Sequence, residues 1–83
     1  MERVIASVYL PAAEKTYDVR LPWDLNAGKA AELVSQALAE LSDGAYLRSR
    51  AAVLIWRETG QFLNPRQTLR QCGVKNTSKL MII

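Results

Sequence analysis

Only one segment of this chain has the periodicity of a long helix. From Ala27 to Leu41 apolar residues recur every three or four positions, whereas the flanking segments alternate apolar and polar residues as strands do. One helix cannot cover both faces of a sheet, so the pattern predicts an α+β fold with one packed and one open sheet face. The apolar stripe of the helix consists of Ala27, Ala30, Ala31, Val34, Ala37, Leu38 and Leu41.

Five short segments are predicted to be strands. The first two form a hairpin, the third and fourth are joined by a turn at Gly60, and the fifth follows a short helical turn that Thr68 caps and Gly73 ends. The fifth segment is so apolar that we expect it inside the sheet and not at an edge. The segments are residues 4–10, 16–21, 52–56, 61–63 and 79–83.

Three residues near the helix have expected structural roles. Asn26 is placed to cap the helix, because its side-chain oxygen can accept hydrogen bonds from free amides of the first turn. Trp23, in the loop before the helix, is expected to cover the helix end, and Trp56 to pack toward the helix.

The length and composition favour one small domain, residues 1–83. No stretch approaches the roughly 20 apolar residues that cross a bilayer, so no membrane insertion is expected. The start of the chain runs directly into a strand pattern and lacks the features of a signal peptide, which indicates a cytoplasmic protein.

The residue types present argue against an enzyme. The chain has no histidine and a single cysteine, Cys72, which excludes an internal disulfide, a Cys/His metal site and a histidine-based catalytic triad. We find no Gly-rich phosphate loop and no paired carboxylates placed for acid–base chemistry. We therefore expect no catalytic residue, no metal and no cofactor, and interpret Cys72 as a small apolar residue.

Charge is divided unevenly along the chain. Residues 1–43 carry four basic and seven acidic side chains, whereas residues 44–83 carry seven basic side chains and one acidic side chain. A basic surface would attract nucleic acid, anionic lipid or acidic protein. A nucleic-acid-binding domain that uses the basic C-terminal half is therefore the alternative function, although the basic residues lack interleaved aromatics. They are Arg48, Arg50, Arg57, Arg66, Arg70, Lys75 and Lys79.

The order of elements resembles that of ubiquitin-like β-grasp domains. The resemblance spans the whole chain and rests on the hairpin, the helix, the strand at Leu54-Ile55-Trp56 and the later motifs Thr68-Leu69, Cys72-Gly73-Val74 and Ser78-Lys79-Leu80. It implies a mixed five-stranded sheet in the order 2-1-5-3-4 with one packed helix. In that order the last strand is central, as its apolar sequence also predicts.

Within this fold the chain is similar to the EsaB/YukD family, small bacterial ubiquitin-like proteins associated with type VII (WXG/ESX-type) secretion systems. The similarity rests on the length, the Asn64-Pro65 and Thr68-Leu69 motifs, and the Pro22-to-Asn26 entry into the helix. It implies a non-catalytic accessory or regulatory module. Its implied partner is a protein, such as a cytosolic part of a membrane secretion complex. The sequence ends in Ile82-Ile83 and not Gly-Gly, so we expect no covalent conjugation.

Alternation along the strands places a set of apolar residues on the open face. Their joint exposure would mark a protein-binding patch, because contiguous apolar surface is typical of interaction sites. The resemblance aligns Ile55, Met81 and Ile83 with the strand positions that form the hydrophobic recognition patch of ubiquitin. Arg57 and Lys79 would form a basic rim, and a homodimer contact through the same face is the other use we consider. The expected patch comprises Ile5, Tyr9, Val53, Ile55, Met81 and Ile83.

Overall fold

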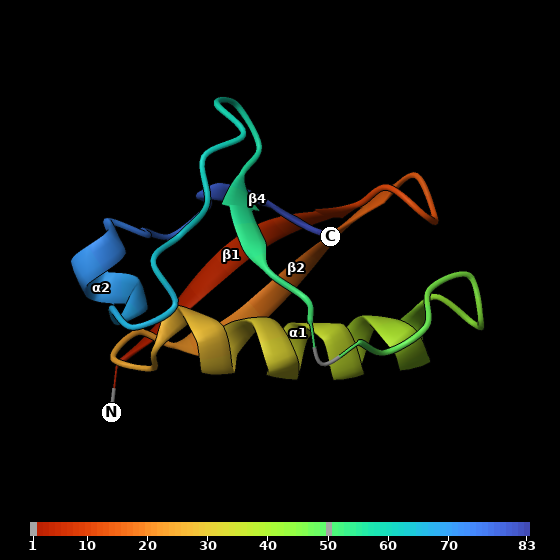
Figure 1. Cartoon of the computed structure of the whole chain (residues 1–83), viewed down its shortest axis with the longest axis horizontal. Helices are drawn as coiled ribbons and strands as arrows, with labels where there is room; N and C mark the ends of the chain where they lie inside the picture. Colours follow the sequence, from red (N-terminus) through yellow and green to blue (C-terminus); the bar gives the residue numbers. More distant parts are fainter. Residues whose placement is uncertain (1, 50) are drawn as a thin grey trace.

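A single mixed sheet with a helix across one face makes up the structure, a computed structural model that describes residues 2–49 and 51–83. The sheet has the order β2-β1-β4-β3, and α1 crosses below it in the view of Figure 1. The described residues form β1 (Arg3–Leu10), β2 (Lys15–Pro22), α1 (Ala27–Leu41), β3 (Leu54–Trp56), α2 (Leu69–Cys72) and β4 (Lys79–Ile82).

The last strand is central, as its sequence predicts. β4 runs parallel to β1 and antiparallel to β3, while β1 and β2 form the antiparallel hairpin. The prediction of five strands is wrong in one place. Residues 61–63 do not form a strand and make only an isolated bridge, between Ile55 and Phe62. The segment is too short for more, because it lies between the Gly60 turn and Pro65. The remaining strands keep the predicted order.

The core lies between α1 and the sheet. Alternation predicted the inward residues of β1 correctly, since Val4, Ala6, Val8 and Leu10 are all buried. Most of the helix stripe is also buried, but Ala37 is half-buried and Leu41, at the end, is 63% exposed. Leu41 is the last residue of α1, and the chain turns away from the core directly after it.

The start of α1 is capped by backbone and not by Asn26. Asn26 occupies the cap position, as predicted, but its side chain makes no capping hydrogen bond. The amides of Ala27 and Gly28 donate instead to the carbonyls of Gln67 and Pro65, at 2.8 and 3.1 Å. A Cβ at Gly28 would lie 3.1 Å from the Pro65 Cβ, so glycine permits this close crossing.

The segment before α1 is fastened to α2. Trp23 donates from Nε1 to the Val74 carbonyl at 2.7 Å, and the Arg70 guanidinium stacks 3.9 Å above its ring. Thr68 and Gln71 form the capping box of α2, and Gly73 ends that helix with φ +91°. Trp23 therefore has a structural role, as predicted, but the contacts that define it are with α2 and Val74 and not with the end of α1.

A buried serine fixes the loop that follows α1. Ser35 is fully buried on α1, accepts a hydrogen bond from the Ser49 amide at 2.9 Å, and lies 3.0 Å from the Tyr46 hydroxyl. These bonds hold residues 46–49 against α1, and the chain then enters β3. The sequence analysis assigned no role to Ser35, although a serine inside an apolar helix stripe is the kind of signal that marks such a contact.

Candidate protein-binding surface

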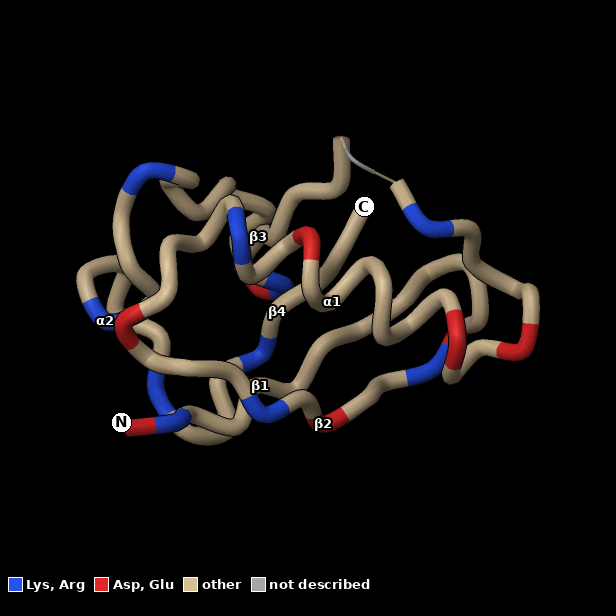
Figure 2. The backbone as a smooth tube through the Cα atoms, turned by 90° about the horizontal axis from the view of Figure 1, so that it is seen from below, with Lys and Arg blue, Asp and Glu red and all other residues tan. Residues whose placement is uncertain are grey.

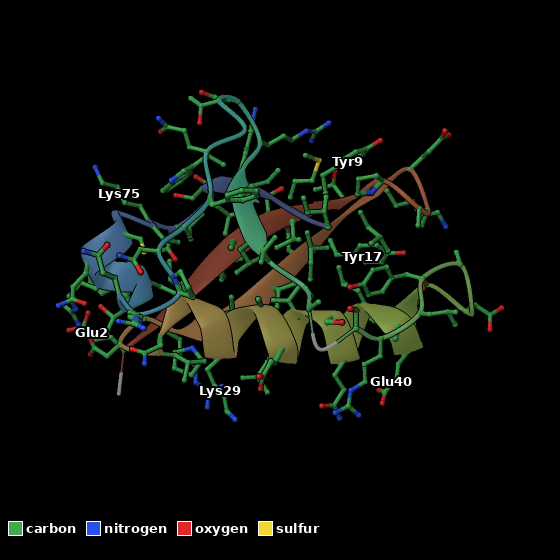
Figure 3. All side chains as sticks on the ribbon, in the orientation of Figure 1. Glu2, Tyr9, Tyr17, Lys29, Glu40 and Lys75 are labelled. Atoms are coloured by element: carbon green, nitrogen blue, oxygen red, sulfur yellow. The ribbon has the colours of Figure 1, made fainter. Side chains whose placement is uncertain are left out.

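Three strands bring apolar residues into one row on the face away from α1. Tyr9 on β1 pairs with Met81 on β4, and Met81 pairs with Ile55 on β3. Residues opposite each other in a sheet share a face. Beside this row Val53 and Ile83 exchange two backbone hydrogen bonds, of 3.1 and 3.2 Å. We call Tyr9, Val53, Ile55, Met81 and Ile83 the open-face patch, and Figure 3 shows Tyr9 on the side of the sheet opposite α1.

The exposure of the open-face patch differs from the expectation at Ile55. Val53 is 38% exposed and Ile83 54%, while Tyr9 and Met81 are half-buried. Ile55 is only 5% exposed, yet it lies outside the core cluster between sheet and helix. It is placed on the predicted face but is buried there, because Met81 on β4 flanks it on one side and Phe62 on the other. The accessible part of the patch is thus its margin.

Ile5 does not join the other apolar residues. It lies on the same face of β1, but Ser7 stands between it and Tyr9, and four residues along a strand span roughly 13 Å. Its amide donates to Asn76 Oδ1 at 2.9 Å, and its carbonyl accepts from the Thr77 amide at 2.7 Å. Ile5 is 39% exposed and borders the turn before β4, apart from the patch.

Phe62 extends the apolar surface at the sheet edge. It bridges to Ile55 and is 68% exposed, which is more than any residue of the open-face patch. Sequence reasoning placed Phe62 in a return strand without including it in the site. The signal was present, because Leu63 packs in the core and alternation then turns Phe62 outward.

Arg57 and Lys79, the two cations predicted to border the patch, lie next to each other beside it. The Arg57 amide donates to the Lys79 carbonyl at 3.1 Å, and Lys79 pairs with Ser7 on β1. The Arg57 guanidinium lies over the Tyr9 ring, 4.2 Å from its centroid. Within the described part of the chain neither cation takes part in an ion pair. We call Arg57 and Lys79 the basic rim.

The other basic residues of the C-terminal half do not gather beside the basic rim. Arg70 forms a bidentate pair with Asp24, at 2.8 and 3.2 Å, and lies 3.5 Å from Glu2. The hydrogen bond to Arg70 holds the pKa of Asp24 below its ordinary value, and the same bond raises the pKa of Arg70. Figure 2 shows basic positions distributed around the molecule. Arg50 lies outside the described residues.

The described residues contain no arrangement suited to metal binding. Among them no group of three or more His, Cys, Asp or Glu side chains could hold a metal ion. Cys72 is half-buried, and burial raises the pKa of its thiol, which disfavours the reactive thiolate. Within the same part of the chain, no helix is long and apolar enough to cross a membrane.

Comparisons with known proteins identify the fold. Neither family models nor curated protein sequences give a match. Among solved structures, the ubiquitin-like domain of the Mycobacterium tuberculosis type VII secretion system protein EccD1 aligns with a TM-score of 0.78 and 14% identity, covering 100% of this chain and 99% of that one. The EccD5 ubiquitin-like domain from Mycobacterium xenopi aligns with a TM-score of 0.81 and 13% identity, covering 100% of this chain and 94% of that one. The ubiquitin-like domain of Plasmodium falciparum Dsk2 aligns with a TM-score of 0.67 and 17% identity, covering 98% of this chain and 96% of that one.

This chain has a ubiquitin-like β-grasp fold. The alignments extend over nearly the full length of both partners, so the helix and the sheet correspond and not just a shared hairpin. The predicted fold class is therefore confirmed, with four strands in place of five. At identities of 13–17% the likeness establishes the fold and leaves function to the site itself.

Proposed function

We propose that this chain is a non-catalytic, ubiquitin-like protein-interaction module of the EsaB/YukD type. In this proposal residues 1–83 form a single domain that acts in the bacterial cytoplasm as an accessory or regulatory component of a type VII secretion system. Its partner is a protein, such as a cytosolic part of the membrane secretion complex, and binding is non-covalent.

The observation that carries the proposal is the full-length structural match to two EccD domains. Both are ubiquitin-like domains, one of them named as part of a type VII secretion system protein, and both align with the whole of this chain at TM-scores of 0.78 and 0.81. The sequence independently resembles small ubiquitin-like proteins associated with such systems. Two lines of reasoning, one from motifs and one from shape, thus lead to the same class of machinery.

The open-face patch is the surface that we assign to the partner. Val53, Ile83 and the neighbouring Phe62 present exposed apolar atoms, and the basic rim supplies two cations that form no ion pair with another described residue. An apolar centre beside a charged border is typical of protein interfaces. The complementary partner surface has apolar side chains flanked by carboxylates.

Affinity capture from the native bacterium tests this proposal. Tagged wild-type protein should co-purify with a component of the type VII secretion machinery, identified by mass spectrometry. The Met81→Asp variant should lose that component, because it places a carboxylate in the middle of the apolar row. Ile5→Asp is the matched control, since it makes the same kind of change on the same face outside the patch. Capture that survives Met81→Asp in a folded protein would contradict the assigned surface.

Nucleic-acid binding is the alternative, and its supporting observation is the basic charge of residues 44–83. Against it, Arg70 is engaged by Asp24 and Glu2, and the remaining cations are spread over several surfaces. Titration with a labelled single-stranded oligonucleotide at low salt separates the two functions. Binding that weakens steeply with added salt would favour the alternative, whereas no binding at low salt excludes it.

A further inference from the structure

One edge of the sheet is covered and the other is open. At the β3 edge, residues 61–63 form backbone hydrogen bonds, with Leu63 donating to Leu54 at 3.0 Å and Trp56 donating to Gln61 at 2.9 Å. β2 lies at the opposite edge and, among the described strands, pairs with β1 alone. No side-chain hydrogen bond in the described chain reaches the backbone of residues 15–21. An eight-residue strand with a free edge is a template for another strand.

The residues of β2 restrict what can pair with it. Its solvent-side residues are Thr16, Asp18 and Arg20, all exposed, and its core-side residues include the half-buried Tyr17 and Val19. Asp18 and Arg20 belong to none of the ion pairs formed among the described residues. One negative and one positive charge therefore stand two positions apart on the same side of an open edge.

If β2 of one molecule pairs with β2 of a second molecule, Asp18 and Arg20 lie opposite each other in only one register. Antiparallel pairing of β2 with a second β2 keeps side chains on matching faces only if the two residue numbers add to an even total. A total of 36 sets Asp18 opposite its own copy, and a total of 40 sets Arg20 opposite its own copy, both like-charge pairs. A total of 38 sets Asp18 opposite Arg20 twice, with Val19 on the symmetry axis.

We propose that a second copy of this chain pairs through β2 to form a symmetric dimer. The two β2 strands run antiparallel with Asp18 opposite Arg20 and Tyr17 opposite Leu21, so that residues 16–22 of each copy form the contact. The contact is isologous, because each copy contributes the same surface. Both four-stranded sheets join into one, and both α1 helices lie on the same side of it.

The dimer leaves the open-face patch accessible. The patch lies on β1, β4 and β3, whereas the contact involves only the outer edge of β2. Because the faces match across the contact, both patches point to the same side. A dimer would therefore offer two binding surfaces to a multi-copy membrane assembly and gain avidity without new contacts. The inference does not depend on the identity of the partner.

Sedimentation equilibrium of charge variants tests the register. At low ionic strength the wild-type mass should rise with concentration from 9.3 kDa toward twice that value. In an Arg20→Asp dimer two carboxylates would lie opposite each other in each pair, and in an Asp18→Arg dimer two guanidiniums would. Each variant alone should therefore associate at least about tenfold more weakly than wild type. Their equimolar mixture should form a heterodimer, and the double variant Asp18→Arg/Arg20→Asp should dimerise like wild type. Circular dichroism verifies folding of each variant.

Three results would overturn the proposal. The wild type could remain a monomer up to millimolar concentration, which would leave the β2 edge to a strand from another protein. The wild type could dimerise while both single variants dimerise equally well, which would place the contact elsewhere. The folded double variant and the mixture could both fail to restore the dimer, which would exclude the pairing of Asp18 with Arg20.

Discussion

Arg57 lies over the aromatic ring of Tyr9, with its guanidinium carbon 4.2 Å from the ring centroid. This contact joins the basic rim to the open-face patch and holds a cation in place beside apolar surface. A cation held by a ring loses less conformational entropy on binding than a free side chain does. Under the proposed function, this contact would hold the rim ready for a carboxylate of the partner.

Replacing Arg57 should therefore affect binding more than stability. We expect Arg57→Ala to weaken partner binding by about tenfold, or roughly 1.4 kcal/mol, while an exposed cation–π contact contributes only about 0.5–1 kcal/mol to folding. Isothermal titration and urea denaturation measure the two quantities. Arg66→Ala, at an exposed arginine outside the rim, is the control. Equal loss of affinity in both variants would show that only net charge matters.

Ile55, the buried residue of the patch, should behave as a packing residue. Ile55→Ala is expected to lower the free energy of unfolding by about 2–4 kcal/mol, because it removes side-chain atoms that are 95% covered. Val53→Ala, on the same face but 38% exposed, should cost less than about 1 kcal/mol. Urea denaturation compares the two variants. Similar costs at the two positions would contradict the burial of Ile55.

The Ser35 contact should contribute measurably to stability. Ser35→Ala leaves the Ser49 amide without its acceptor and should cost about 1–3 kcal/mol. Tyr46→Phe retains the Ser49 bond and removes only the hydroxyl that lies 3.0 Å from Ser35, so it should cost less. Thermal denaturation ranks the two. A larger loss in Tyr46→Phe would place the main anchor of this loop at the tyrosine.

Asp24 should give stability a component that disappears in acid. Arg70 lowers the pKa of Asp24 in the folded state, so the ionised form is favoured by folding. The stabilisation is full above the ordinary carboxyl pKa of 3.8 and is lost as pH falls through the lower folded pKa. Asp24→Asn should therefore be less stable than wild type at pH 7, with the difference shrinking below pH 3.8. A difference that stays constant across this range would exclude the linkage.

Much of the fold could be predicted because its signals are local. Alternation in residues 4–10 and the helical stripe from Ala27 each indicate which side chains are buried, and a single helix leaves only one sheet face covered. The cap at Thr68 and the stop at Gly73 are also local and were predicted, although the reciprocal bond from Gln71 was not. The cap of α1 was not, because its acceptors are carbonyls of residues 65 and 67, distant in the sequence.

The sequence predicts on which sheet face the residues of the site lie, but not how deeply each of them is buried. Alternation placed Tyr9, Ile55 and Met81 on the open face, but burial depends on neighbours across strands, and Ile55 is covered from both sides. Ile5 shares that face, yet only the register shows that Ser7 separates it from Tyr9. The β2 edge likewise follows from strand order and not from any motif.

Secretion of WXG-type substrates in the native bacterium tests the central claim most directly. The gene is deleted and replaced by wild type, Met81→Asp or Ile5→Asp, and secreted substrate is quantified in the culture medium. We predict that deletion changes secretion, that wild type and Ile5→Asp restore it, and that Met81→Asp does not although the protein accumulates normally. Unchanged secretion after deletion, or full restoration by Met81→Asp, would contradict the account.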